Sequence, residues 1–267
     1  MVNKICRIKN YLNNKMPLIH CITNPISING CANVILSLGA RPVMAEHPCE
    51  VCEITASADA LMLNSGNITD ARMKSVFLSM KTAKEKNIPV LLDVVGIACS
   101  GFRREYIHGF LNSFTPSVIK GNYSEIKALY DEAYFSSGVD AELSLDADDI
   151  AIIASRLSHK YKSVILATGK TDVAAHGEKI FYIKNGTQSL AKLTGTGCML
   201  GALCTAFMTS ASPADAAAAA CCYFGICGEL SETDRGLGSF MVNLMDKISV
   251  VDIKEYSQML KLEDKTI

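Results

Sequence analysis

The chain has 267 residues, of which 49% are hydrophobic and 20% are charged, and its formal net charge is −1 at pH 7. This length lies within the range of a single α/β domain with a large core. The near-neutral charge excludes the basic footprint of a nucleic-acid-binding protein, so we expect a small-molecule partner and no nucleic acid.

The 11 cysteines do not form the pattern of a disulfide scaffold. Their number is odd, and most lie inside apolar runs, as Cys221 and Cys222 do, so we expect reduced thiols. Cys49 and Cys52 have the spacing of half a zinc site, but no second pair of ligands follows. The first residues lack the apolar core of a signal peptide, and no stretch reaches the ~18 apolar residues of a membrane span. We expect a soluble, cytoplasmic protein without a membrane partner.

The first third of the chain alternates apolar segments of helical spacing with short apolar runs typical of buried strands. The helical segments are residues 3–14, Ser27–Leu38, Cys49–Ala58 and Thr69–Lys86. The predicted strands are Leu18–Ile22, Arg41–Ala45, Ala60–Asn64 and Ile88–Asp93. Three of these strands end at or shortly before Asn24, Gly66 and Asp93, where we expect loops that open into a cleft.

The middle of the chain continues this alternation and adds a hairpin. Strands are predicted at Ser117–Lys120 and Ser163–Gly169, and a helix at Asp146–Ser158. Asn122 is a predicted N-cap with Glu125 three residues later, as in a capping box. Residues 131–149 are the most polar part and predict a surface loop or insertion. The runs Val173–His176 and Lys179–Ile183 predict an antiparallel hairpin at the edge of the sheet.

The segment Leu193–Gly201 has the glycines of a tight loop, and Met199–Thr209 after it predicts a buried helix. A glycine loop at a helix N-terminus presents unpaired N–H groups and the positive end of the helix dipole, which can hold a phosphate. Cys198 lies in the first turn, where we expect the pKa of its thiol to be lowered. A plain turn before a core helix with a buried cysteine is the alternative. The chain that follows, including Ala214–Leu230, is predicted to be almost all helical.

Strands that alternate with helices predict an α/β fold, with a doubly wound, mostly parallel central sheet, helices on both faces and an antiparallel edge hairpin. We expect one domain over residues 1–267, since no linker or repeat divides the chain. Ligands of such sheets bind outside the carboxyl ends of the strands. The loops after the predicted strands, together with the glycine loop, should therefore surround one site.

Six separate blocks carry a more specific pattern. They are Pro17–Asn24, Ala32–Asn33, Gly39–Ala45, Val118–Asn122, Thr194–Cys198 and Gly238–Phe240. In this order they resemble the hydroxyethylthiazole kinase family of thiamine salvage, over a match from about Pro17 to about Asp246. The resemblance implies a ribokinase-like fold and transfer of the γ-phosphate of ATP, with Mg²⁺, to the primary alcohol of 4-methyl-5-(2-hydroxyethyl)thiazole. It also implies a homotrimer with thiazole sites at subunit contacts.

The same resemblance assigns site residues. It implies that Met44, Asn24, Gly66 and Gly195 bind the thiazole substrate. It implies that Lys120, Thr168 and Asn122 contact ATP, and that Asp93 and Glu125 are the acids associated with Mg²⁺. Catalysis falls to Cys198 with Gly195, Thr196 and Gly197, whose backbone N–H groups would form an anion hole for the transferring phosphoryl group.

The chain departs from the family pattern at two positions. Lys120 stands where the family usually has arginine, which keeps the charge but loses the bidentate fork, so we expect weaker phosphate binding. Val94 stands where the family usually has proline, which leaves the loop after Asp93 less constrained. Related ribokinase-like enzymes carry an aspartate base where this chain has Cys198.

Three alternatives remain open at this point. A kinase of the same fold could act on hydroxymethylpyrimidine, pyridoxal or a sugar, although such enzymes usually have aspartate in place of Cys198. A thiazole or nucleotide sensor without catalysis would explain the cysteine but not the accompanying Asp93, Glu125 and Lys120. A hydrolase with Cys198 as nucleophile would need a neighbouring base, for which His20 and His176 are the candidates.

Overall fold

The computed structural model describes residues 1–135, 146–250 and 253–267. In these residues one nine-stranded sheet has the order β2-β1-β3-β4-β5-β6-β7-β8-β9. The parallel strands are β1 (Leu18–Ile22), β2 (Arg41–Val43), β3 (Ala60–Asn64), β4 (Val90–Asp93), β5 (Val118–Asn122) and β6 (Val164–Thr168). The antiparallel strands are β7 (Asp172–His176), β8 (Lys179–Ile183) and β9 (Leu262–Thr266). The predicted fold class and the antiparallel hairpin are confirmed.

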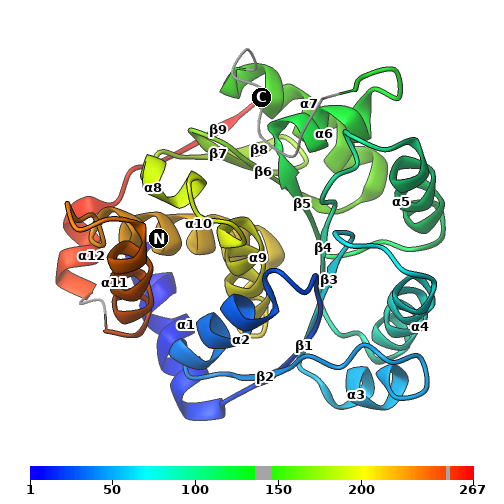
Figure 1. Cartoon of the computed structure of the whole chain (residues 1–267). Coiled ribbons are helices and arrows are strands. Elements are labelled where there is room, and N and C mark those ends of the chain that lie inside the picture. Colours follow the sequence, from blue (N-terminus) through cyan, green and yellow to red (C-terminus); the bar gives the residue numbers. More distant parts are fainter. Residues whose placement is uncertain (136–145, 251–252) are drawn as a thin grey trace.

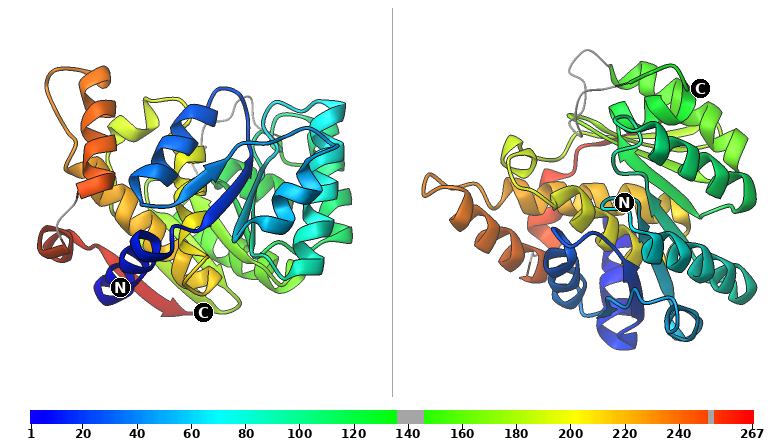
Figure 2. Two further views of the ribbon diagram at one scale, coloured as in Figure 1. Left: turned by 90° about the horizontal axis from the view of Figure 1, so that it is seen from below. Right: turned by 45° about the vertical axis from the view of Figure 1, so that its right-hand side comes forward.

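Helices cover both faces of the sheet (Figure 1). On one face lie α1 (Val2–Lys15), α2 (Ile28–Ser37), α9 (Thr196–Phe207) and α10 (Pro213–Glu229). On the other lie α3 (Val51–Ser57), α4 (Asp70–Lys86), α5 (Gly101–Ser113), α6 (Tyr123–Tyr130) and α7 (Ala147–Tyr161). The short α8 (Gln188–Ala191) precedes the glycine loop. Figure 2 shows α11 (Leu237–Val250) and α12 (Ile253–Met259), in orange and red, at the margin outside α1 and α10.

The central strands are apolar throughout because both of their faces are covered. Successive side chains of a strand point to opposite faces. In β3, Leu61 and Leu63 therefore enter the hydrophobic cluster of α3–α7, whereas Met62 enters the cluster of α1, α2, α9 and α10. The continuous apolar runs in the sequence follow from this double burial.

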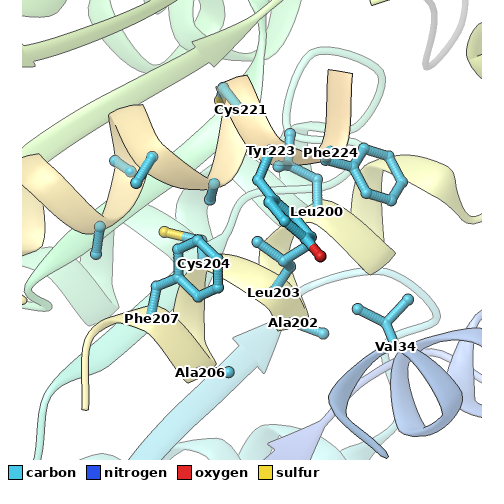
Figure 3. Close-up of a cluster of buried hydrophobic side chains, with 14 of the residues drawn as sticks. Val34, Leu200, Ala202, Leu203, Cys204, Ala206, Phe207, Cys221, Tyr223 and Phe224 are labelled. Atoms are coloured by element: carbon cyan, nitrogen blue, oxygen red, sulfur yellow. The ribbon is translucent and has the colours of Figure 1, made fainter. Parts of the chain in front are cut away.

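Close packing of α10 on α9 fixes the helix that carries the glycine loop (Figure 3). The alanine run 216–220 is fully buried, which lets the two helices approach closely. Tyr223 of α10 points toward α9, and its ring centroid lies 5.9 Å from that of Phe207. The Tyr223 hydroxyl donates to the carbonyl oxygen of Ile248 at 2.6 Å, which satisfies this buried polar group. Helix α9 is therefore anchored to α10 by buried side chains along its length.

The structure corrects some sequence predictions. Helix α5, at Gly101–Ser113, was not predicted. The chain after the glycine loop was predicted to be almost all helical, and no strand was predicted there. Its last element, Leu262–Thr266, is strand β9, because it pairs with the edge of β8. The helix predicted at Met199–Thr209 begins earlier, at Thr196. Of the loop predicted at 131–149, residues 136–145 lie outside the described residues, and α7 already begins at Ala147.

Candidate active site

The carboxyl ends of the parallel strands place the predicted site residues in one row. Asp93, the last residue of β4, is in register with Asn64 on one side and with Lys120 on the other. Further along the sheet, Asn122 of β5 is in register with Thr168 of β6. The parallel sheet thus brings together residues that are far apart in the sequence, as the strand-end reasoning predicted.

A buried ion pair stands at the centre of this row. The Lys120 Nζ atom lies 3.0 Å from Oδ2 of Asp93, and the two side chains are only 4% and 1% exposed. Burial alone would lower the pKa of Lys120, but the negative charge of the neighbouring Asp93 outweighs it and raises that pKa. Lys120 therefore keeps its positive charge at neutral pH. Oδ1 of Asp93 is buried and has no hydrogen-bond partner among the described residues.

Glu125 joins the loops after β4 and β5. Its carboxylate accepts the backbone N–H of Gly96 on Oε1 and that of Asn122 on Oε2, both at 2.8 Å. The Asn122 side chain in turn accepts the backbone N–H of Glu125 at 2.8 Å, which completes the predicted capping box. Burial and the charge of Asp93 raise the pKa of Glu125 to about 7, although its two backbone N–H donors act in the opposite direction.

The loop after Asp93 is held without the proline of the family pattern. The backbone N–H of Val94, a group that proline lacks, donates to the Lys120 carbonyl oxygen at 2.8 Å. The Arg103 guanidinium donates to the carbonyl oxygens of Val95 and Ser65, and so ties this loop to the one after β3. These hydrogen bonds supply the restraint that we expected the loop to lack.

The glycine loop forms the N-terminus of α9. Gly195 is the N-cap residue with φ 87°, a left-handed conformation that favours glycine. The Thr196 hydroxyl donates to the carbonyl oxygens of Leu190 and Leu193 at 2.8 and 3.1 Å, so this side chain holds the preceding turn. A Cβ atom on the exposed Gly197 would lie 3.8 Å from Nζ of Lys120. The Lys120 ammonium therefore lies beside the free N–H groups of the helix N-terminus.

Cys198 follows in the first turn of α9 and is 9% exposed. Its sulfur accepts amide N–H groups from Asn64 at 3.3 Å and from Asn24 at 3.4 Å. The expectation of a lowered pKa is wrong. Burial and the charge of Asp93 raise the pKa of the Cys198 thiol, and this outweighs the opposing charge of Lys120. The sequence shows the helix N-terminus but not the carboxylate that faces it.

Asn24 and Gly66, two predicted substrate residues, meet through Asn64. The Gly66 backbone N–H donates to Oδ1 of Asn64 at 2.8 Å, and the Asn24 amide donates to the same atom at 3.4 Å. Met44 lies one residue beyond β2, is partly exposed and packs against the hydrophobic cluster that includes Cys198. The three residues thus line neighbouring parts of one edge, with Met44 toward the end of the sheet.

Thr168 ends β6, and its hydroxyl donates to the Gly121 carbonyl oxygen at 3.4 Å. The turn that follows is firmly held. The Gly169 N–H donates to Oδ1 of Asp172 at 3.0 Å, and the ring of Tyr123 packs so closely on Gly169 that a Cβ atom there would lie 2.7 Å from it. Thr168 is therefore presented from a rigid turn on the far side of Lys120 from Cys198.

The candidate bases for a thiol hydrolase lie elsewhere. The ring nitrogens of the buried His20 hydrogen-bond to the Thr55 hydroxyl and to the Ala45 carbonyl oxygen, both at 2.9 Å. His176 is exposed at the far end of β7. Neither contacts Cys198 in the described part of the chain, so the structure gives no support to that alternative.

Sequence reasoning missed Asn64, whose side chain contacts Asp93, Cys198 and Asn24. A signal was available, because Asn64 is the only polar residue of an apolar strand and stands at its carboxyl end. Within residues 1–135, 146–250 and 253–267, no group of three or more His, Cys, Asp or Glu side chains could hold a metal ion, and no helix is long and apolar enough to cross a membrane.

Comparisons with known proteins identify the family. Residues 9–254 match the model of the hydroxyethylthiazole kinase family. Hydroxyethylthiazole kinase 2 of Clostridium botulinum (strain Langeland) is 46% identical over 241 residues, which cover 88% of this chain and 90% of that protein. The solved structure of a hydroxyethylthiazole kinase protein from Pyrococcus horikoshii OT3 has a TM-score of 0.90 at 30% identity, over 98% of this chain and 99% of that one.

A more distant structure supports the fold alone. A ribokinase-like superfamily protein from Enterococcus faecalis V583 has a TM-score of 0.64 at 13% identity and covers 94% of each chain. The ribokinase-like architecture expected from the resemblance is confirmed. From the family match and the identity to its members, the chain belongs to the hydroxyethylthiazole kinase family.

Proposed function

We propose that the chain transfers the γ-phosphate of ATP to the hydroxyethyl group of 4-methyl-5-(2-hydroxyethyl)thiazole, as a kinase of thiamine salvage. One observation carries the proposal. The N-terminus of α9, the buried Lys120 ammonium and the Cys198 sulfur meet at one point, so an anion hole and a hydrogen-bond acceptor lie side by side. A phosphoryl group needs the first, and an attacking alcohol needs the second.

The anion hole supplies most of the catalysis in this proposal. Phosphoryl transfer has a loose transition state and is catalysed mainly by positioning and charge stabilisation. The backbone N–H groups of residues 195–198 and the Lys120 ammonium would stabilise the charge on the transferring group. Thr168 and Asn122, at the neighbouring strand ends, would contact the nucleotide. Met44, Asn24 and Gly66 would hold the thiazole ring on the opposite side.

A divalent cation fits the acids of the site. Oδ1 of Asp93 is a buried oxygen that has no hydrogen-bond partner in the part of the chain that the structure describes, and a carboxylate oxygen is the kind of ligand that Mg²⁺ prefers. We propose that Asp93 would hold Mg²⁺ directly and Glu125 through water, since both Glu125 oxygens already accept backbone N–H groups. Bound Mg²⁺ would neutralise part of the phosphate charge.

Cys198 would orient the alcohol. Its raised pKa keeps the thiol almost entirely protonated at neutral pH, so only a small thiolate fraction can accept the alcohol proton. A general base contributes roughly 10²–10⁴-fold in enzymes generally, and a weak base suits a reaction that depends mainly on charge stabilisation. The first role of the sulfur would therefore be to fix the direction of attack.

The proposed function extends to the oligomeric state and the cellular location of the chain. We propose a cytoplasmic, single-domain chain that forms a homotrimer with sites at the subunit contacts. Ile26, two residues after Asn24, is 73% exposed, and we expect it to lie at such a contact. Sedimentation equilibrium would measure the mass of the assembly, and a monomeric mass would reject this part of the proposal.

The decisive experiment measures ADP release with ATP and Mg²⁺, and compares hydroxyethylthiazole with hydroxymethylpyrimidine and pyridoxal. We expect turnover with hydroxyethylthiazole only. Cys198→Ala should lower kcat without abolishing ATP binding, and Cys204→Ala, which removes a buried thiol of the same helix, should not change kcat. Turnover with a different alcohol would reassign the substrate, and ADP release with none of the three would favour a sensor.

A further inference from the structure

The side chain of Asn64 lies between the Asp93 carboxylate and the Cys198 sulfur. Its amide nitrogen donates to Oδ2 of Asp93 and to the sulfur of Cys198, both at 3.3 Å. Its amide oxygen accepts the Gly66 backbone N–H and the Asn24 amide. The side chain is 7% exposed, so these contacts are shielded from water.

The direction of each amide is fixed by a backbone group. The Gly66 N–H points at one end of the Asn64 side chain, and only an oxygen can accept it, so the NH₂ group must face Asp93 and Cys198. The Ser27 N–H fixes Asn24 in the same way at 3.1 Å. Two N–H donors therefore converge on the Cys198 sulfur, which makes the sulfur an acceptor toward both amides.

The same amide also determines which oxygen of Asp93 is available. Oδ2 accepts from Lys120 at 3.0 Å and from Asn64 at 3.3 Å, whereas Oδ1 is left without a partner. Asn64 therefore helps to orient the carboxylate by binding Oδ2 together with Lys120, which leaves Oδ1 available. One NH₂ group contacts the phosphate side and the alcohol side of the site at the same time.

We propose that Asn64 is a positioning residue that aligns the Cys198 sulfur with the Asp93 carboxylate for phosphoryl transfer. The inference rests on the proposed kinase function, because alignment matters only if an alcohol at Cys198 attacks a phosphate held beside Asp93. Asn64 acts through these two side chains and need not touch either substrate. Its contribution should appear in the rate of the chemical step and not in ground-state binding.

The test replaces the donor and keeps the shape. Asn64→Asp retains an oxygen for Gly66 but loses the NH₂ group, and Asn64→Leu removes both functions without adding a charge. We expect each to lower kcat by about 10- to 100-fold, with KM for hydroxyethylthiazole and for ATP within about threefold of the wild type. Ser163→Ala is the control, since it removes two buried hydrogen bonds at the opposite end of the sheet and should leave kcat unchanged.

A double-mutant cycle with Cys198→Ala separates positioning from general damage. If Asn64 acts partly through the sulfur, Asn64→Leu should cost at least about threefold less in the Cys198→Ala background than in the wild type. The inference is overturned if Asn64→Leu lowers kcat by the same factor in both backgrounds, or if kcat does not change. It is also overturned if both KM values rise together while the melting temperature falls. A wild type without turnover on hydroxyethylthiazole would instead reject the proposed function, so the two failures are distinguishable.

Discussion

Replacement of Lys120 by methionine tests the buried ion pair most directly. Methionine keeps an unbranched side chain of similar length but carries no charge. The Asp93 carboxylate, which is 1% exposed, would then be a buried charge whose only side-chain partner among the described residues is the Asn64 amide. Removal of one member of a buried pair is far more costly than replacement of both members, because the remaining charge stays desolvated.

The expected loss follows from the geometry. At 3.0 Å and an effective dielectric constant of ~20, the attraction between Lys120 and Asp93 is about 5 kcal/mol. Part of it is regained because the ammonium no longer has to be desolvated. We therefore expect the free energy of unfolding of Lys120→Met to fall by about 3–5 kcal/mol at pH 8. The double variant Lys120→Met/Asp93→Asn should recover most of this loss.

The effect has a defined pH dependence. Burial raises the pKa of Asp93 and the Lys120 charge opposes this, so the variant should raise that pKa further. When the pKa of a carboxyl group is higher in the folded than in the unfolded state, the group stabilises the fold at a pH below its pKa in the unfolded state. This stabilisation is lost as the pH rises through its pKa in the folded state. Lys120→Met should therefore be less destabilised at pH 5 than at pH 8.

Urea unfolding of the wild type and the variants at pH 5 and 8 measures these differences. Lys4→Met is the control, because its pair with Asp215 is 48% and 26% exposed and should contribute less than about 1 kcal/mol. The reasoning is refuted if Lys120→Met unfolds within about 1 kcal/mol of the wild type at pH 8. It is also refuted if the double variant is no more stable than the single one.

Three further predictions concern the loops and the substrate. Gly195→Ala and Gly236→Ala both place alanine at positive φ, so urea unfolding should show that both variants are destabilised. Only Gly195→Ala brings a Cβ atom to 3.3 Å from Ser27, so only this variant should be slow in the kinase assay. The pKa of Glu125 is raised to about 7, so its contribution to the free energy of unfolding should fall as the pH rises from about 5 to 8. Glu125→Gln should flatten the pH dependence of this free energy, and an unchanged slope would contradict the prediction. Met44→Ala should raise KM for hydroxyethylthiazole but not for ATP, and equal changes in both would remove Met44 from the thiazole pocket.

The strand ends were predictable from the sequence because a parallel sheet determines where they meet. Apolar runs that end in Asp93 or Lys120 are visible without coordinates, and the carboxyl ends of parallel strands meet at one edge of the sheet. The register that places Asp93 directly beside Lys120 comes from the structure. The helix after the glycine loop was predictable from local sequence, because two glycines are followed by an apolar run. Its first turn holds Cys198 as expected.

Long-range electrostatics could not be predicted in the same way. The thiol pKa of Cys198 depends on Asp93 and on burial, and neither distance nor depth is written in the local sequence. Asn64 was overlooked because an asparagine at a strand end usually caps a turn, and only its register with Asp93 reveals a second role. Strand β9 was missed because its charged residues favour strand only when a neighbouring edge is available.

The two margins of the sheet have a consequence for how copies of this chain can associate. Among the described residues the sheet ends on β2 and β9. Strand β2 has only three residues and contains Pro42, which cannot donate to a further strand, and β9 carries the consecutive charges Glu263, Asp264 and Lys265. Both features discourage strand addition. Contacts between copies should therefore form through helices and loops, which leaves the sheet discontinuous from one subunit to the next.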